Sequence, residues 1–240
     1  MTGTILTAYP DKVAQRSISL FDKLLSPAPE FDLSFTDDHN RDDIEDFIRE
    51  KFRKAYAARI DEFFPSILCM QCFGRLSATA GMRVARQAPL FLEQYLDHTI
   101  EHELSQRTGD TVPRSSIVEI GNLVASQRGA SHILFLLFTS VLHHAGYQWI
   151  TFTGTRALQN NLGKLGFELT YLCEADPSKL EGNAQETWGK YYDTRPQVLA
   201  GNLDNAMQII QSRPLFRRVL RLYRSRISEL VHEFKEARHD

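Results

Sequence analysis

The segment from Ile117 to Phe167 constrains the fold more than any other part of the 240-residue chain. An apolar run passes through a glycine-containing turn into a helix-like stretch, and a second apolar run at Trp149 leads into another helix-like stretch that ends in Leu-Gly-Phe. Short apolar runs bounded by turn residues are typical of buried strands, whereas longer stretches with a period of about 3.6 residues are typical of helices. The segment therefore predicts a strand–helix–strand–helix unit with a parallel crossover.

The sequence before this unit predicts further strands and helices. Glu30 begins an alternating run that is typical of a half-buried strand, and residues 42–60 carry apolar side chains at helical spacing. Two apolar runs around Gly74 predict a strand pair, and residues 89–106 predict a helix that ends before Gly109. This order of elements predicts an α+β fold, close to α/β, with a central mixed sheet.

We divide the chain into three parts. Residues 1–29 are predicted to form an N-terminal arm, residues 30–178 the core, and residues 179–240 a C-terminal extension that ends in a basic amphipathic helix. From Pro214 onward, apolar residues recur at helical spacing and arginines fill the gaps. Such a helix docks an acidic partner, lies peripherally on an anionic membrane, or simply presents a solvated face. The arginines through which it would contact a partner are Arg217, Arg221 and Arg224.

Charge and composition argue against several classes of function. The 28 basic and 30 acidic residues give a net charge of −2, which does not suit a nucleic-acid-binding surface. The longest apolar run, Ile133–Phe138, is far shorter than the roughly 20 residues that span a bilayer, and the N-terminus does not resemble a signal peptide. Three cysteines are too few for a disulfide framework. We therefore expect a cytoplasmic protein without a transmembrane segment.

No metal site is predicted from the histidines. His98 and His102 stand four residues apart, but no glutamate follows His98 directly as the HExxH motif requires. A solvated helix face is the simpler interpretation of this pair.

Glu119 is the candidate general base. It lies in a strand that otherwise reads Ile, Val, Ile, Leu and Val, and a carboxylate among apolar neighbours is costly unless it is paired or protonated. Burial would raise its pKa into the range that is useful for deprotonating an ammonium group. The alternative is that Glu119 faces solvent or pairs with an arginine for structural reasons.

Several motifs resemble those of the thermostable hemolysin family, which is similar in turn to GNAT-type N-acyltransferases. They are VEIGNLVAS in the first strand of the unit, residues 149–155, residues 165–167, residues 174–177 and WGKYYDTRP from Trp188. The segment from Arg83 to Ala125 also resembles acyl-homoserine-lactone synthases and N-acyl amino acid synthases. The resemblance implies a GNAT-type mixed sheet flanked by helices, followed by a C-terminal helical extension.

The resemblance also implies an activity. The expected reaction is transfer of an acyl group from acyl-CoA or acyl carrier protein to a small amine or amino acid. No cofactor would be bound tightly, because acyl-CoA or acyl-phosphopantetheine would be a co-substrate. The acyl carrier protein would be the acidic partner of the basic helix. The alternative, suggested by the family name, is a non-catalytic protein that acts on membranes or binds lipid.

The resemblance further assigns site residues. The pantetheine arm would contact Leu123, Val124 and Ala125 at the end of the strand. The phosphate loop would comprise Gln127, Arg128, Gly129, Ala130 and Ser131, although the spacing departs from the usual Gln/Arg-x-x-Gly-x-Gly/Ala pattern. Asn160 and Asn161 would hydrogen-bond the pantetheine amides or form an exposed pair. Leu162 stands where the superfamily often has a tyrosine that protonates the leaving thiolate.

Overall fold

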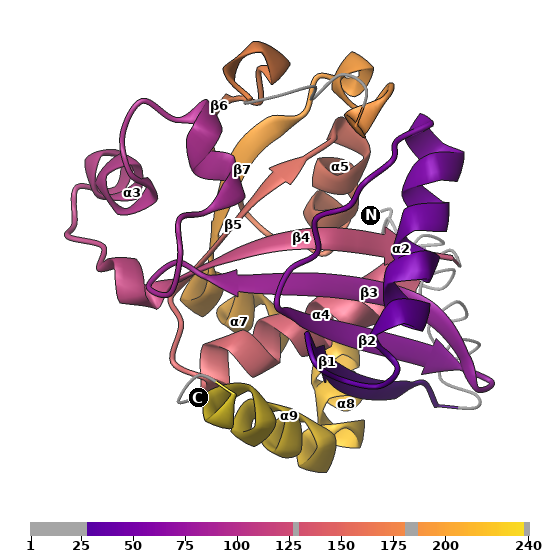
Figure 1. Ribbon diagram of the computed structural model, residues 1–240. Coiled ribbons are helices and arrows are strands. Elements are labelled where there is room, and N and C mark those ends of the chain that lie inside the picture. The colour runs from indigo at the N-terminus through magenta and orange to yellow at the C-terminus, as the bar shows by residue number, and fades with distance from the viewer. Residues whose placement is uncertain (1–27, 127–129, 181–186, 238–240) are drawn as a thin grey trace, which may run out of the picture.

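A mixed sheet of seven strands runs through the centre of the molecule (Figure 1). The computed structural model describes residues 28–126, 130–180 and 187–237. The strands are β1 (Glu30–Phe35), β2 (Ser66–Cys72), β3 (Arg75–Val84), β4 (Ile117–Ala125), β5 (Trp149–Gly154), β6 (Thr170–Glu174) and β7 (Gln197–Asn202), in the order β1-β2-β3-β4-β5-β7-β6. The helices are α2 (Arg41–Tyr56), α3 (Ile100–Thr108), α4 (Ala130–His144), α5 (Arg156–Lys164), α7 (Leu203–Ser212), α8 (Pro214–Leu222) and α9 (Arg224–Glu236).

The strand–helix–strand–helix unit is confirmed as β4-α4-β5-α5. β4 and β5 pair in parallel, while the other neighbouring strands pair antiparallel. The parallel register starts at Ile117 opposite Trp149 and ends at Ile120 opposite Phe152, although β4 continues to Ala125. The two strands therefore part at their carboxyl ends.

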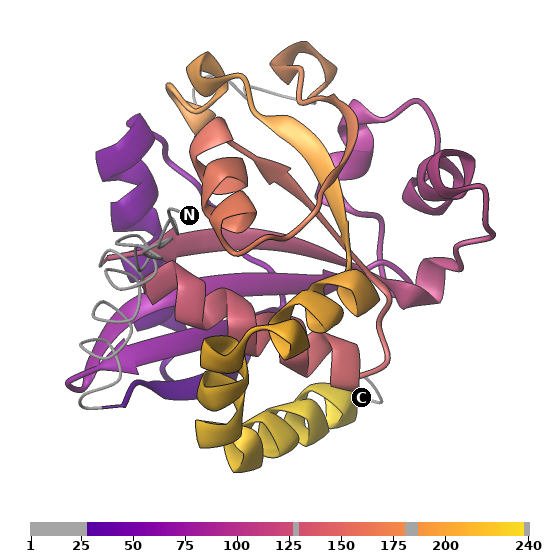
Figure 2. The ribbon, with the colours of Figure 1, turned by 180° about the vertical axis from the view of Figure 1, so that it is seen from behind.

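Helices cover both faces of the sheet. α2 lies across one face, in front of β3 and β4 (Figure 1), whereas α4, α7, α8 and α9 cover the other face (Figure 2). Eleven of the fifteen residues of α4 are buried, because this helix lies between the sheet and the C-terminal helices. A helix that is apolar nearly all round belongs in the interior, and here it forms the centre of the largest core cluster.

The predicted helix over residues 89–106 is wrong in its first half. Phe91–Tyr95 is a short 3-10 turn, and the α-helix begins only at Ile100. Backbone N–H groups of this segment donate to a carboxylate rather than to the carbonyl oxygens of a helix. Glu93 accepts hydrogen bonds from the N–H groups of Leu90 (2.8 Å) and Ile100 (3.0 Å). Arg114 pairs with Glu93 and fixes it in place. Periodicity alone does not reveal such side-chain contacts.

The predicted C-terminal helix also differs in detail. It breaks at Tyr223 into α8 and α9, which allows both pieces to pack against α4. β7 arises from the segment between residues 179 and 240 and lies between β5 and β6 in the sheet. Within the described ranges, no helix is long and apolar enough to cross a membrane.

Candidate active site

A bulge in β4 shapes the strand at the point where it leaves β5. The register between β3 and β4 shifts near Thr79 and Gly81, and Asn122 has a φ of 46°. Asparagine tolerates this left-handed region better than most residues. The hydroxyl of Thr79 donates to the Asn122 carbonyl oxygen at 2.8 Å, which holds the bulge against β3.

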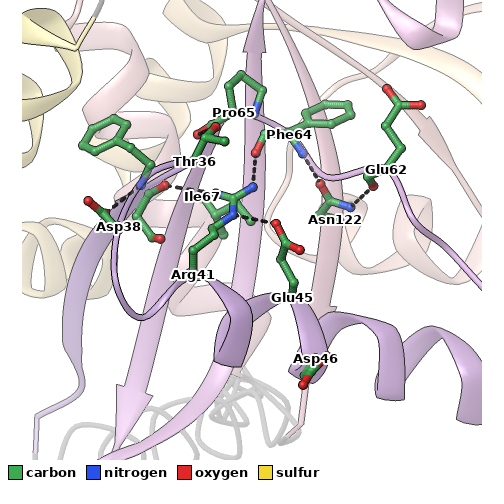
Figure 3. A network of polar contacts seen from close by, with 12 residues as sticks. Thr36, Asp38, Arg41, Glu45, Asp46, Glu62, Phe64, Pro65, Ile67 and Asn122 are labelled. Atoms are coloured by element: carbon green, nitrogen blue, oxygen red, sulfur yellow. Dashed lines mark hydrogen bonds and ion pairs between the residues drawn. The ribbon is translucent and has the colours of Figure 1, made fainter.

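The Asn122 side chain fastens the segment before β2 to this bulge (Figure 3). Its Oδ1 accepts a hydrogen bond from the Phe64 N–H at 2.8 Å, and its Nδ2 donates to the Glu62 carbonyl oxygen at 3.3 Å. The buried Arg41 donates to the Phe64 carbonyl oxygen at 2.6 Å. The Phe64 ring lies over Gly121, where an added Cβ would come within 2.6 Å of it. Gly121 is therefore required for this close contact.

A pocket of about 600 Å³ opens where β4 and β5 part. Its walls come from α2, the second half of β4, the first turn of α4, the end of β5, α5 and residues 188–192. A volume of this size is typical of small-molecule sites. The pocket has a charged rim as well as apolar walls, since Lys51, Lys54 and Glu62 also line it.

A second, smaller cavity of about 30 Å³ lies beside the pocket, toward the core. It lies among β4, β5, α4, α5 and α7, and its walls are almost entirely apolar. The residues that line both spaces are Ile120, Leu123, Phe135, Phe152 and Leu158. The two spaces therefore share a wall at the gap between β4 and β5.

The structure brings together part of the set predicted from the sequence. The predicted residues that line the large pocket are Glu119, Leu123, Val124, Ala125, Ser131 and Asn161. Asn160 is exposed on α5 and is not part of the wall, and Ala130 is buried at the start of α4. Gln127, Arg128 and Gly129 lie outside the described residues. Leu162 is buried and lines the small cavity, so α5 presents no hydroxyl group at that position.

Glu119 is only 2% exposed and lines the large pocket. Its two carboxylate oxygens accept hydrogen bonds from the N–H groups of Phe91 and Leu92, each at 2.9 Å. Burial raises the pKa of Glu119 to about 7, although these two hydrogen bonds and the charge of Arg83 oppose the shift. A carboxyl group with this pKa exchanges protons near neutral pH. The expectation that Glu119 is buried is confirmed.

Aromatic side chains form much of the wall beside Glu119. Trp188, Tyr191 and Tyr192 line the pocket, whereas Trp149 is buried in a separate core cluster. Sequence reasoning missed other members of this wall, which are Phe52, Tyr56, Phe91 and Tyr95. Their helical spacing indicated core positions, and no local signal shows that they meet residues 188–192. Asn122 was missed too, although a Gly-Asn pair inside a strand is a signal of a bulge.

No group of three or more His, Cys, Asp or Glu side chains that could hold a metal ion occurs in the described part of the chain.

The sequence was compared with protein-family models and with curated protein sequences. A family model described as thermostable hemolysin matches residues 35–207. No curated protein sequence matches the chain.

Three solved structures are similar to the chain. The AHL synthase LasI is 10% identical with a TM-score of 0.50, and the match covers 73% of this chain and 90% of LasI. TofI in its apo form is 9% identical with a TM-score of 0.51, over 78% of this chain and 99% of TofI. FeeM, an N-acyl amino acid synthase from uncultured soil microbes, is 11% identical with a TM-score of 0.48, over 73% and 97% of the two chains. The likeness to LasI and TofI confirms the predicted α+β fold with its GNAT-type mixed sheet.

Proposed function

The chain belongs to the thermostable hemolysin family, and on that premise we propose that it is an N-acyltransferase. It moves an acyl group from acyl-CoA or acyl carrier protein to a small amine or amino acid. One observation carries the proposal: the pocket with the buried Glu119 opens at the gap between β4 and β5. In the same space, the unpaired edge of β4 can bind a thioester and the carboxylate of Glu119 can accept a proton.

The donor lies along β4 in this proposal. Beyond Ile120, β4 pairs with β3 on one side and has no β5 partner on the other. The backbone at Leu123, Val124 and Ala125 is thus available to the amides and the thioester carbonyl of a pantetheine arm. The phosphate lies at the N-terminus of α4, where Ser131 lines the pocket, because the first turn of a helix presents free N–H groups. The acyl chain lies in the large pocket, against the apolar wall that the pocket shares with the small cavity.

Glu119 moves the proton. It accepts a proton from the ammonium group of the acceptor, and the free amine attacks the thioester carbonyl carbon to form the C–N bond. Backbone N–H groups stabilise the oxyanion. The adduct loses a second proton to water, the C–S bond breaks, and sulfur leaves with the electron pair and takes a proton from water. Protonated Glu119 then returns its proton to the solvent. A thiol pKa of about 8.5 makes the thiolate a fair leaving group without a tyrosine at Leu162.

Asn161 and its neighbour Asn160 provide a matched test of the donor site. Asn161 lines the pocket and Asn160 does not. Asn161→Ala should raise the Kd for acyl-CoA by about 2- to 13-fold, which corresponds to loss of one hydrogen bond of about 0.5–1.5 kcal/mol. Asn160→Ala should leave it unchanged. Calorimetric titration measures both, and equal effects of the two substitutions would remove Asn161 from the donor site.

The exposed arginines of α8 and α9 suit an acidic acyl carrier protein. Arg217, Arg221 and Arg224 are exposed and have no ion pair among the described residues. Arg226 differs, because it pairs with Asp32 and Glu233 and so supports the fold. A cationic surface without internal partners attracts an acidic protein and accelerates the encounter.

Reversing Arg217, Arg221 and Arg224 to glutamate should slow acylation from acyl carrier protein by about 10-fold or more at low salt and flatten its salt dependence. Transfer from acyl-CoA should change little. Initial rates with both donors test this result. Equal loss with both donors would indicate a structural defect, and unchanged rates with both would leave these arginines as a solvated face.

A further inference from the structure

The aromatic wall of the pocket is built around one tryptophan. We define the wall as Phe52, Phe91, Trp188, Tyr191 and Tyr192, which all line the large pocket. The ring centroid of Trp188 lies 5.3 Å from that of Tyr191 and 5.7 Å from that of Phe91. Its centroid lies 6.1 Å from Phe52 and 6.3 Å from Tyr192. These side chains come from α2, the 3-10 turn and residues 188–192, and they meet around the pocket.

The wall is a lining and not only a packed core. Four of its five members, all except Tyr191, are only half-buried. The members also contact one another edge-on or at a tilt, as in the 72° angle between Phe52 and Trp188. Aromatic rings at 4.5–7 Å prefer such offset or edge-to-face contacts, each contributing about 0.5–1.5 kcal/mol beyond area burial. A further ring that enters the pocket would gain contacts of the same kind.

Glu119 is hydrogen-bonded to a residue of the aromatic wall. The N–H of Phe91 donates to the Glu119 carboxylate at 2.9 Å, so the backbone of one wall residue touches the base. The rings of Phe91 and Trp188 line the same pocket as Glu119, so the substituent of an ammonium group bound at Glu119 can reach them. A carboxylate has about four lone-pair sites, so an ammonium can bind in addition to the two backbone donors.

The charged residues at the rim of the pocket restrict the charge that the acceptor can carry. Lys51 and Lys54 line the same pocket from α2. Glu50 neutralises part of this charge through its ion pair with Lys54 at 2.7 Å. Glu62, the acidic residue of the rim, is already paired with Arg83 at 2.6 Å. The lysines therefore disfavour an acceptor with a second positive charge, and they suit an acceptor with a carboxylate.

We propose that the acceptor is a primary amine that carries an aromatic ring and no second positive charge, either an aromatic amino acid or an arylalkylamine. The inference rests on the proposed function and adds the chemical class of the acceptor. The reaction is the one given above, with the C–N bond formed at the amine and the C–S bond broken at the donor.

The test compares acceptors that differ only in the ring. With acyl-CoA as donor, kcat/KM for 2-phenylethylamine should exceed that for 2-cyclohexylethylamine by about 2- to 13-fold, the equivalent of 0.5–1.5 kcal/mol of aromatic contact. Phenylalanine should also be accepted, and lysine and spermidine should be poor acceptors. Trp188→Leu should bring this ratio of kcat/KM values close to one by raising the KM for 2-phenylethylamine, while the KM for acyl-CoA is unchanged. Phe73→Leu is the matched control, because Phe73 is 75% exposed and lies outside the pocket.

The outcomes separate the two proposals. A wild-type ratio of one or less, or efficient acylation of spermidine, would overturn the acceptor class while acyl transfer itself stands. A complete lack of transfer from acyl-CoA and from acyl carrier protein to every amine would contradict the proposed function instead. The wild-type comparison needs no variant, so the test holds even if Trp188→Leu fails to fold.

Discussion

Replacing Glu119 with glutamine should lower acyl transfer by about 10²- to 10⁴-fold while the protein remains folded, as expected for loss of a general base. Glutamine keeps the shape of the side chain and one acceptor oxygen. Its amide group, however, faces one of the two backbone N–H donors, which costs about 1–3 kcal/mol. Removal of a buried ionisable group offsets part of that cost at neutral pH.

The pH dependence of the rate tests the same residue. The pKa of Glu119 is about 7, so wild-type kcat/KM should rise with pH through this value as the carboxylate forms. This dependence should be lost in Glu119→Gln. Glu62→Gln is the comparison variant, because Glu62 lines the same pocket but is largely exposed and pairs with Arg83. It should keep the pH dependence with a somewhat lower pKa, since the charge of Glu62 contributes to the raised pKa of Glu119. An unchanged rate in Glu119→Gln at neutral pH would remove Glu119 from the mechanism.

The same pKa has a consequence for stability. The folded state binds the Glu119 proton more tightly than the unfolded chain, whose carboxyl pKa is near 4.5. The contribution of Glu119 to stability is therefore fully present below about pH 4.5 and is lost as pH rises through about 7. The free energy of unfolding of wild type relative to Glu119→Gln should fall over this window, by an amount on the order of 3 kcal/mol. Urea titrations at several pH values measure the difference, and a difference that rises with pH would contradict burial as the dominant effect.

Replacing Asn122 with alanine should destabilise the fold by about 2–4 kcal/mol and reduce acyl transfer at least about 10-fold. The buried Phe64 N–H loses its acceptor, and alanine must occupy the left-handed conformation at a φ of 46°. Without this anchor, the β4 bulge and the Phe64 ring over Gly121 lose their fixed positions. The backbone that would hold the thioester follows directly after the bulge.

Asn122→Gly separates the two causes. Glycine adopts the left-handed conformation without strain, so only the hydrogen bonds of the amide are lost. The free energy of unfolding should then fall by about 1–3 kcal/mol, less than for alanine. Chemical denaturation measures both variants. Equal stability of Asn122→Ala and wild type would show that the network drawn in Figure 3 does not hold the bulge.

Local patterns predicted the parts of the fold that depend on local physics. The apolar runs around Ile117 and Trp149, with a helix between them, predicted β4-α4-β5 because a buried parallel pair requires such a crossover. The apolar neighbours of Glu119 along one strand favoured its burial but left a solvent-facing side chain open, and the structure confirms burial. Both Asn160 and Asn161 were assigned to the site, because the sequence does not show which of two adjacent helical residues faces a pocket. The structure places only Asn161 in the pocket wall.

Long-range contacts explain what the sequence did not reveal. Residues 91–95 form a 3-10 turn because Glu119, far along the chain, accepts hydrogen bonds from two of their N–H groups. The aromatic wall joins α2 to Trp188, more than one hundred residues away in sequence, so neither segment alone indicates a pocket. The anchoring of Phe64 by Asn122 and Arg41 likewise depends on three separate elements.

Binding of a non-hydrolysable acyl donor tests the thioester site at the β4–β5 gap most directly. Calorimetric titration would use thioether analogues of coenzyme A and of phosphopantetheine, each with acyl chains of graded length, with wild type and with Leu158→Trp, since Leu158 lines both the pocket and the small cavity. We expect wild type to bind at least one analogue, more tightly with each added methylene by up to about 0.8 kcal/mol, and Leu158→Trp to lose this gain. Absence of binding to both analogues, or equal binding to wild type and Leu158→Trp, would contradict a thioester site between β4 and β5.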